Sequence, residues 1–369
     1  MKLKRHGILA GVMLTAALAL AACGSDNNTD SPTAGSSSSG ASADCATGKL
    51  TAQGSTAQTN AVAQWVKDFQ AKCSGATVDY QGTGSGAGIQ AFGGGTADFA
   101  GSDSPMKAAD EQPKADARCG TGNKAIHLPM VIGPIAVVTN LSGVTDLQFS
   151  ASTLAKIYSG KITTWDDAAI KADNPGATLP GTKITAIHRQ DSSGTNDNFT
   201  KYLSKAAAAD WTYDHAKDWK APGGQGETKS DGVSTAVAKT DGAIAYVEWS
   251  FAIANNLHMA KIKNASGEFT ALSADSAGKT IASAKVDGTG NDLKMTIDYN
   301  TPAAGAYPIV LVTYEIVCEK GNQADKLPLL KSFLGYAAGD GQATLTRLGY
   351  APLPSDVQAK VAASVKALA

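Results

Sequence analysis

The sequence predicts an α/β protein built of two lobes, and three observations carry this prediction. The chain has 369 residues, too long for one average domain, and its 43% hydrophobic content can give each lobe a core. From Leu50 onward, short apolar runs typical of strands alternate with amphipathic helices, the pattern of an α/β fold with mainly parallel sheets. A nearly all-apolar run, Ile309 to Val317, follows a long middle section, so we expect the chain to leave a first lobe, build a second and return.

The first 22 residues are expected to be a signal peptide. A basic start, MKLKRHG, precedes the apolar run ILAGVMLTAALALAA, which is short for a membrane span. The next residues, LAAC, are typical of a lipobox, in which Cys23 is lipidated and becomes the new N-terminus. An ordinary signal peptide with an incidental cysteine is the alternative. The multiple acyl chains of a bacterial lipoprotein would anchor the protein to the outer face of the cytoplasmic membrane.

Residues 23–44 are expected to form a flexible tether after the lipidated cysteine. The run GSDNNTDSPTAGSSSSGASAD has no aromatic and almost no apolar residue. It cannot bury enough surface to offset the entropy lost on ordering. The folded body therefore begins near Cys45.

Seven apolar runs are predicted as strands, and one helix stands out between the first two. Val62, Trp65, Val66 and Phe69 follow the i, i+3, i+4, i+7 spacing of one helix face. The predicted strands are KLTAQ (49–53), ATVDYQ (76–81), ADFAGS (97–102), IGPIAVVTN (132–140), KITAIHR (183–189), GAIAYV (242–247) and YPIVLVTYEIV (307–317).

The rest of the chain sets the expected domain boundaries. Residues 275–305, rich in Gly, Asp, Ser and Ala, predict a helix and then irregular chain, and further helices are expected from about Gln323 and Pro354. We expect a first lobe made of residues 45–138 and 307–369, and a second lobe made of residues 139–306.

Four cysteines remain once Cys23 is set aside, an even number in an exported chain, which predicts disulfides. Of the three connectivities we favour Cys45 with Cys73, which are close in sequence, and Cys119 with Cys318. A zinc site of four thiolates is the alternative, but the sequence has no C-x-x-C pair.

Charge argues against a nucleic-acid partner. The formal net charge is −1, and removing the three cationic residues of the first 22 leaves −4 for the rest of the chain. Nucleic-acid affinity comes largely from Lys and Arg that neutralise phosphates.

Four stretches place small polar residues directly after a predicted strand, and three of them precede a helix. In QGSTAQ (53–58), Ser55 and Thr56 lie at a helix start, where free N–H groups and hydroxyls attract anions. A simple Ser/Thr N-cap is the alternative. In YQGTGSGAGIQAF (80–92), glycines let the backbone approach a ligand closely and Ser85 is placed to cap the next helix.

The third stretch, TADFAGSDSP, runs a strand into Asp103. The alternative is an Asp that caps a helix after Pro105. A carboxylate suits an anion site only when the anion itself carries a proton.

The fourth stretch is RQDSSGTN, residues 189–196. Arg189 ends a strand, and Ser193, Gly194 and Thr195 offer hydroxyls and N–H groups at the start of a helix. Asp191 is placed to brace the guanidinium, whose planar fork suits a tetrahedral oxyanion better than lysine does. A salt-bridged loop with an N-cap is the alternative. The following helix is expected to turn three apolar residues to the core: Phe199, Tyr202 and Leu203.

Nucleotide and metal sites are not expected. GTGSGA (82–87) fits the dinucleotide-binding pattern G-x-G-x-x-A. The acidic residue about twenty positions on, Asp103, lies in a stretch that ends in a turn, whereas a residue that binds the ribose would lie at the end of a strand. No Walker motif occurs, and the five histidines lack ligand spacing. We expect no cofactor and no metal.

These stretches together resemble the phosphate-binding receptors of bacterial ABC phosphate importers, the PstS family. The resemblance covers nearly all of the chain after the tether. It rests on GST, YQGTGSGAG, DFAGSDSP, KIYSGKITTWDDAAIKADNPGATLPGTKI, HRQDSSGTNDNFTKYLS, DGAIAYVEWSFA and YAPLP. It implies a two-lobed periplasmic-binding-protein fold of type II, with phosphate held in the cleft between the lobes.

The resemblance also implies which residues hold phosphate, with Asp191 as the acidic partner of the arginine. Ala57 stands where many members have phenylalanine; its N–H can still donate, but the aromatic cover is lost. His188 receives no role. The implied phosphate-binding residues are Ser55, Thr56, Ala57, Ser85, Asp103, Arg189, Ser193, Gly194 and Thr195.

The implied function is a monomeric, non-enzymatic receptor that delivers inorganic phosphate to a membrane permease and its ATPase. Asp103, ionised, would accept the proton of hydrogenphosphate and reject sulfate, which has none at neutral pH. The alternatives are an exported phosphomonoesterase, which needs a nucleophile or a metal cluster, and a polyphosphate-sensing or adhesion lipoprotein on the same scaffold.

Overall fold

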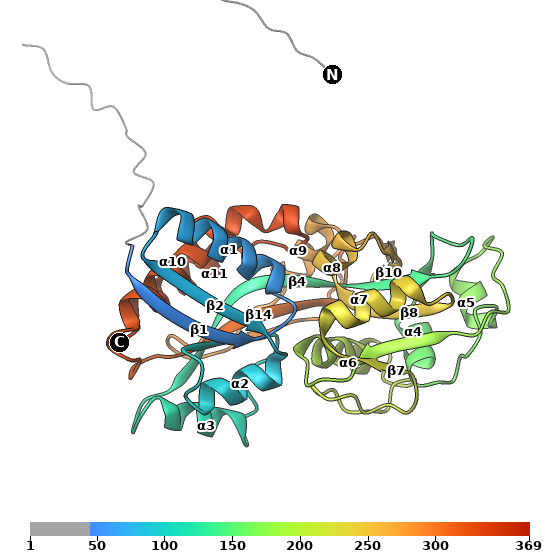
Figure 1. The fold of residues 1–369 in the computed structure, drawn as a ribbon. Coiled ribbons are helices and arrows are strands. Elements are labelled where there is room, and N and C mark those ends of the chain that lie inside the picture. Colours follow the sequence, from blue (N-terminus) through green and yellow to red (C-terminus); the bar gives the residue numbers. More distant parts are fainter. Residues whose placement is uncertain (1–44) are drawn as a thin grey trace, which may run out of the picture. The chain divides into compact units, whose positions relative to one another are not determined.

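The computed structural model describes residues 45–369, so the predicted signal peptide, Cys23 and the tether lie outside the described residues. No helix in the described part of the chain is long and apolar enough to cross a membrane. Strands and helices alternate along this part, as the sequence predicts (Figure 1).

The first third of the described chain holds β1 to β4 and three helices. The predicted helix face is confirmed in α1, where Val62, Trp65 and Phe69 are buried. The bounds are β1 Gly48–Gly54, α1 Thr59–Lys72, β2 Ala76–Gly82, α2 Ser85–Gly93, β3 Phe99–Ser102, α3 Glu111–Arg118 and β4 Ala125–Asn140.

The middle third carries most of the short elements. Phe199, Tyr202 and Leu203 of α6 are buried, which confirms the core face predicted for that helix. The bounds are β5 Gln148–Phe149, α4 Ala151–Tyr158, α5 Ala168–Asp173, β6 Thr185–Arg189, α6 Gly194–Ala206, β7 Gln225–Glu227, α7 Lys229–Lys239, β8 Ala243–Glu248 and α8 Trp249–Ala254.

The last third confirms the late buried strand, since every residue of β14 is buried. The predicted helix at 275–305 is α9, and two short strands follow it. The bounds are β9 His258–Met259, β10 Lys261–Lys263, β11 Phe269–Thr270, α9 Ala274–Ala282, β12 Lys285–Val286, β13 Met295–Thr296, β14 Val310–Cys318, α10 Leu327–Ala338 and α11 Ser355–Ala367.

A nine-stranded sheet runs through residues 45–369 in the order β2-β1-β3-β14-β4-β8-β6-β7, with β9 also paired to β4. The prediction of mainly parallel pairing is only partly right. β1 pairs in parallel with β2 and β3, and β6 pairs in parallel with β7 and β8. β14 is antiparallel to both β3 and β4, and β4 is antiparallel to β8. The central strands differ because the returning chain runs back alongside β4.

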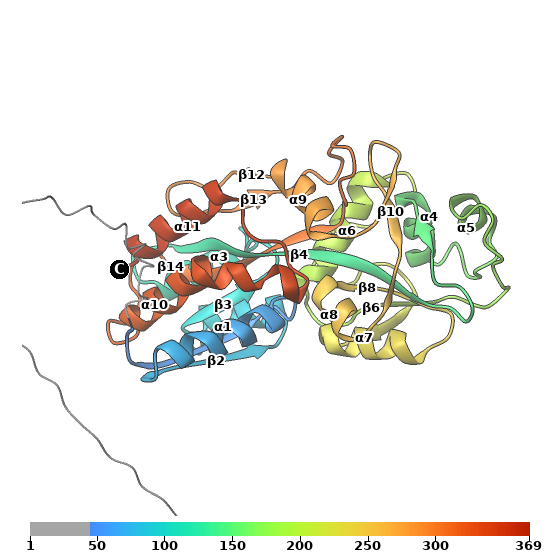
Figure 2. The ribbon, with the colours of Figure 1, turned by 90° about the horizontal axis from the view of Figure 1, so that it is seen from above.

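β4 joins the two parallel groups of strands, and Figure 2 shows it running from the region of α10 and α11 to that of α4 and β8. Its first half pairs with β14 and its second half with β8. One hydrophobic core takes β4 residues up to Ile132, and two others take residues from Ile135 onward. The packing therefore changes partner in the middle of β4.

Two disulfides join Cys45 to Cys73 and Cys119 to Cys318. This is the connectivity favoured from the sequence, and it leaves none of these four thiols for zinc. The second disulfide ties the end of α3 to the end of β14 across 199 residues of sequence.

Candidate functional site

The four polar stretches meet where strands of the two parallel groups end. Parallel strands present their carboxyl ends at one edge, so β1 and β3 bring Ser55 and Asp103 together. β6 and β8 likewise end at Arg189 and Glu248. Hydrogen bonds then connect the two groups, since Gly194 N donates to Ser85 Oγ at 3.2 Å.

Asp103 is the centre of this cluster. Its side chain accepts hydrogen bonds from Ser55 Oγ at 2.5 Å and Thr313 Oγ1 at 2.7 Å on one oxygen, and from Ser85 Oγ at 3.0 Å on the other. The residue is only 3% exposed. Burial raises the pKa of Asp103 to about 6, although the three hydroxyl donors oppose the shift. The carboxylate is therefore largely ionised at neutral pH.

Arg189, 2% exposed, supplies the positive charge. Its Nε and Nη2 donate to the two oxygens of Asp191 at 2.7 and 2.5 Å, the bracing that the sequence suggested. Burial opposes the charged form of each partner, yet their pairing raises the pKa of Arg189 and lowers that of Asp191. Nη1 lies 3.5 Å from Thr195 Oγ1 and 3.4 Å from Ser230 Oγ.

The start of α6 closes one side of the cluster. Ser193 is its N-cap and accepts from Asn196 N, as the capping interpretation of this stretch proposed. Gly194 packs against Asp103 so closely that a Cβ there would lie 2.4 Å from the Asp103 Cβ. Only glycine fits this position without displacing the aspartate. Thr195 donates its hydroxyl to Glu248.

The loop after β1 contributes Thr56 and Ala57. Thr56 Oγ1 and Ser230 Oγ share a hydrogen bond of 2.8 Å. Ala57 is buried, and its carbonyl accepts from Tyr350 Oη at 2.7 Å. Tyr350 begins the YAPLP motif, so the end of the chain braces this loop.

Three capping interpretations are wrong. α1 begins at Thr59, and its N-cap, Gln58, makes no side-chain cap bond, so the hydroxyls of Ser55 and Thr56 do not cap it. Ser85 is the first residue of α2, and its hydroxyl donates to Asp103. Asp103 caps no helix, because α3 begins only at Glu111. In each case a partner distant in sequence takes the hydrogen bond.

Three further polar side chains in the cluster were not singled out from the sequence. Glu248 ends β8 in the motif YVEWS; it is buried, and its Oε2 has no hydrogen-bond partner among the described residues. Thr313 was hidden in an apolar strand, where a lone threonine is common. Ser230 is the second residue of α7 and carries no motif signal.

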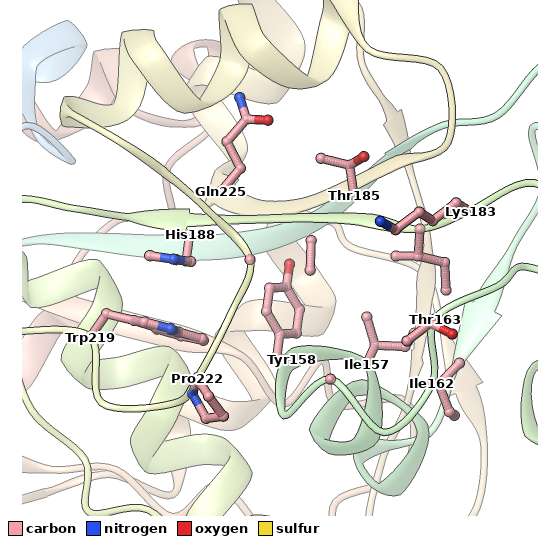
Figure 3. A pocket seen from close by; sticks show the side chains of 14 residues that line it. Ile157, Tyr158, Ile162, Thr163, Lys183, Thr185, His188, Trp219, Pro222 and Gln225 are labelled. Atoms are coloured by element: carbon pink, nitrogen blue, oxygen red, sulfur yellow. The ribbon is translucent and has the colours of Figure 1, made fainter.

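His188 faces away from the cluster, as alternation along a strand requires. It lines a hollow of about 310 Å³ whose other lining residues include Tyr158, Lys183 and Trp219 and none of the anion cluster. Figure 3 shows the side chains of this hollow. The His188 ring stacks on Trp219 with centroids 4.4 Å apart, and burial lowers its pKa. This agrees with giving His188 no role at the anion site.

The fold is that of a periplasmic-binding-protein domain. Residues 38–340 match the family described as the PBP superfamily domain. A periplasmic phosphate-binding protein solved with bound phosphate aligns with a TM-score of 0.70 at 24% identity, over 86% of this chain and 93% of that one. A putative phosphate ABC transporter substrate-binding protein from Clostridium perfringens aligns with a TM-score of 0.58 at 18% identity, over 83% and 100%.

Relatives by sequence narrow the family. The chain is 44% identical to phosphate-binding protein PstS 3 of Mycobacterium tuberculosis, over the full length of both. It is 33% identical to phosphate-binding protein PstS of Xylella fastidiosa, over 82% of this chain and 80% of the relative. The chain therefore belongs to the PstS family of phosphate-binding proteins.

Proposed function

We propose that this protein is an extracytoplasmic receptor that captures inorganic phosphate and passes it to an ABC permease and its ATPase. The observation that carries the proposal is that Asp103 and Arg189 are both buried and each lies within hydrogen-bond distance of hydroxyl groups of one cluster. An anionic hydrogen-bond acceptor and a cationic donor in one buried site match an anion that carries both bare oxygens and a proton. Membership of the PstS family supports the same ligand.

Hydrogenphosphate satisfies both charges. Arg189 and N–H groups such as that of Gly194 serve its bare oxygens, while ionised Asp103 accepts its proton. Sulfate would place an unprotonated oxygen against that carboxylate, an unfavourable contact that provides specificity. The side chains and N–H groups proposed to surround phosphate are those of Ser55, Thr56, Ala57, Ser85, Asp103, Arg189, Ser193, Gly194 and Thr195.

The hydroxyl protons need to be redirected when the anion enters. Ser55 and Ser85 donate to Asp103, and Thr195 donates to Glu248. A hydroxyl turns about its C–O bond at little cost, so each can donate to an anion oxygen instead. The carboxylates hold these side chains in place before capture.

Release requires two lobes that hinge, for which we propose the boundaries 45–138 with 307–369, and 139–306. The change of packing partner in the middle of β4 supports this division. Contacts between the proposed lobes surround the site, such as Gly86 N to Ser192 O at 3.1 Å and Gly194 N to Ser85 Oγ. Opening would break these bonds and free the anion.

We further propose that lipidated Cys23 anchors a monomeric receptor at the outer face of the cytoplasmic membrane. Metabolic labelling of the expressed protein with a fatty acid tests this. Label should be incorporated into wild type and absent from Cys23→Ala; equal labelling of both refutes the anchor.

Retention of radiolabelled phosphate on the purified protein tests the main proposal. Unlabelled arsenate, which keeps a proton at neutral pH, should compete, whereas sulfate should not. The proposal is contradicted if the protein retains no phosphate, or if sulfate displaces the bound phosphate as well as arsenate does. Incubation with a chromogenic phosphate ester and added zinc or magnesium should release no product; turnover would favour a phosphomonoesterase.

A further inference from the structure

Ser230 lies between two residues of the anion cluster. Its hydroxyl is 2.8 Å from Thr56 Oγ1 and 3.4 Å from Arg189 Nη1, and the residue is 1% exposed. Thr56 and Ser230 are 174 positions apart in the sequence, so only the fold brings them together.

The Arg189 nitrogen that does not bond Asp191, Nη1, faces Ser230. Asp191 occupies Nε and Nη2 with short bonds, which leaves Nη1 to face Ser230 and Thr195. Both separations from Nη1 are near the upper limit of hydrogen bonding. An anion oxygen is a stronger acceptor than a hydroxyl, so it would take over Nη1 at this point.

Counting protons separates Ser230 from other hydroxyls of the cluster. Ser55, Ser85 and Thr195 each direct their only hydroxyl proton to a carboxylate. Thr56 and Ser230 share one hydrogen bond with each other, which uses one of their two protons. Either oxygen can donate in that bond; when Thr56 donates, the Ser230 proton is available beside Arg189 without breaking a bond to Asp103 or Glu248.

The backbone before Ser230 is held in an unusual conformation. Lys229 has a φ of 61°, in the left-handed region that residues other than Gly, Asn and Asp seldom adopt. Its N–H donates to Asp191 Oδ1 at 3.0 Å. The carboxylate that braces Arg189 thus also holds the first turn of α7 and fixes where Ser230 points.

We propose that Ser230 is a further ligand of the captured anion, donating a hydrogen bond from α7 alongside Arg189. This inference rests on the proposed function and extends it, since it adds a ligand that the sequence motifs do not contain. It also makes Thr56 and Ser230 a paired donor that joins residues 45–138 to residues 139–306 around the anion.

The test compares Ser230→Ala with Ser234→Ala in the purified receptor, titrated with inorganic phosphate in a calorimeter. Ser234 is a matched control because it is also a buried serine of α7, but its hydroxyl donates to Asp231 O in the same helix. Loss of a hydrogen bond to a charged ligand should raise the Kd of Ser230→Ala by about 10- to 100-fold. Ser234→Ala should stay within about twofold of wild type.

Melting temperatures distinguish a ligand from a structural contact. Without phosphate, Ser230→Ala and Ser234→Ala should melt alike, and the rise on adding phosphate should shrink only for Ser230→Ala. A phosphate affinity of Ser230→Ala equal to that of Ser234→Ala overturns the inference. A loss of affinity accompanied by a larger fall in the phosphate-free melting temperature also overturns it.

A second variant and a titration of wild type complete the test. Should Ser230→Ala not fold, Ser230→Cys keeps the shape of the side chain with one larger atom and weakens the hydrogen bond, so a Kd equal to that of wild type refutes the ligand role. Wild type is titrated first. Its failure to bind phosphate would count against the proposed function itself, whereas a normal wild type with an unaffected Ser230→Ala would count only against Ser230.

Discussion

Replacing Asp103 with asparagine tests whether the site recognises a proton on its ligand. The substitution keeps the shape of the side chain. If the amide oxygen takes the Oδ1 position, Ser55 and Thr313 can still donate to it. The amide nitrogen is then left to donate to the anion, because Ser85 Oγ already accepts from Asp103 N and Gly194 N. The variant should therefore fold, with its negative charge replaced by a donor.

The expected loss of selectivity follows from the burial of Asp103. In wild type, sulfate leaves a buried acceptor without its proton, at a cost of about 1–3 kcal/mol, or about 5- to 150-fold in affinity. Repulsion between two negative charges in an enclosed site adds to this cost. Asp103→Asn should remove the penalty, so its preference for phosphate over sulfate should fall by about that factor.

The pH dependence of wild type should show the same effect. Because burial raises the pKa of Asp103 to about 6, the side chain becomes neutral below that pH and can donate to sulfate. Sulfate affinity should therefore increase by up to tenfold per unit as the pH falls towards about 6, and should level off below that pH, where Asp103 is already protonated. Asp103→Asn should lack this dependence, since it has no proton to gain.

Calorimetric titration of both anions at pH 8, 7 and 5 measures these effects. Asp197→Asn is a suitable control, because the Asp197 carboxylate accepts from Ser104 and pairs with His215 and, among the described residues, makes no hydrogen bond to a proposed phosphate-binding residue. Unchanged selectivity in Asp103→Asn, or equal changes in both variants, would refute the role of Asp103 in detecting the proton.

Three further predictions concern charge and stability. Arg189→Ala should weaken binding of phosphate and arsenate alike by at least tenfold in titration, because it removes the buried cation and leaves Asp191 unpaired; retained affinity would contradict this. Burial raises the pKa of Glu315 to about 8, above its ordinary value, so the folded protein holds a proton that the unfolded chain releases, and stability falls as the pH rises from about 4.5 to about 8. In denaturant titrations at pH 9, the free energy of unfolding of Glu315→Gln should therefore exceed that of wild type by up to about 5 kcal/mol. The difference should vanish near pH 4, and equal stability at both pH values would refute the prediction. Replacing Cys119 and Cys318 together with serine should lower the free energy of unfolding by about 2–5 kcal/mol in calorimetry under oxidising conditions, and no change would mean that the disulfide does not constrain the unfolded chain.

Much of the fold could be predicted because its signals are local. The face of α1 repeats within fourteen residues, and β14 is nearly all apolar. Arg189 and Asp191 are two positions apart, so their pairing could be expected from one short stretch. Such patterns depend on neighbours in the chain, which the sequence displays directly.

The pairing of the central strands could not be predicted in the same way. The apolar runs of β4 and β14 indicate burial on both faces, but burial does not determine whether two strands run parallel or antiparallel. That depends on where the chain re-enters the sheet after the long middle section. The tertiary structure places β14 between β3 and β4, antiparallel to both.

The partners of the site hydroxyls were also decided by tertiary structure alone. From the sequence, Ser85 is as suited to cap a helix as to bond a carboxylate, because both options satisfy its hydroxyl equally well. The fold resolves this by bringing Asp103 within reach of Ser85, and of Thr313 across 210 positions of sequence. Ser230 joins Thr56 for the same reason. The sequence by itself determined the strands, the helices and the charges available for an anion, whereas contacts between distant segments decided which hydroxyls surround it.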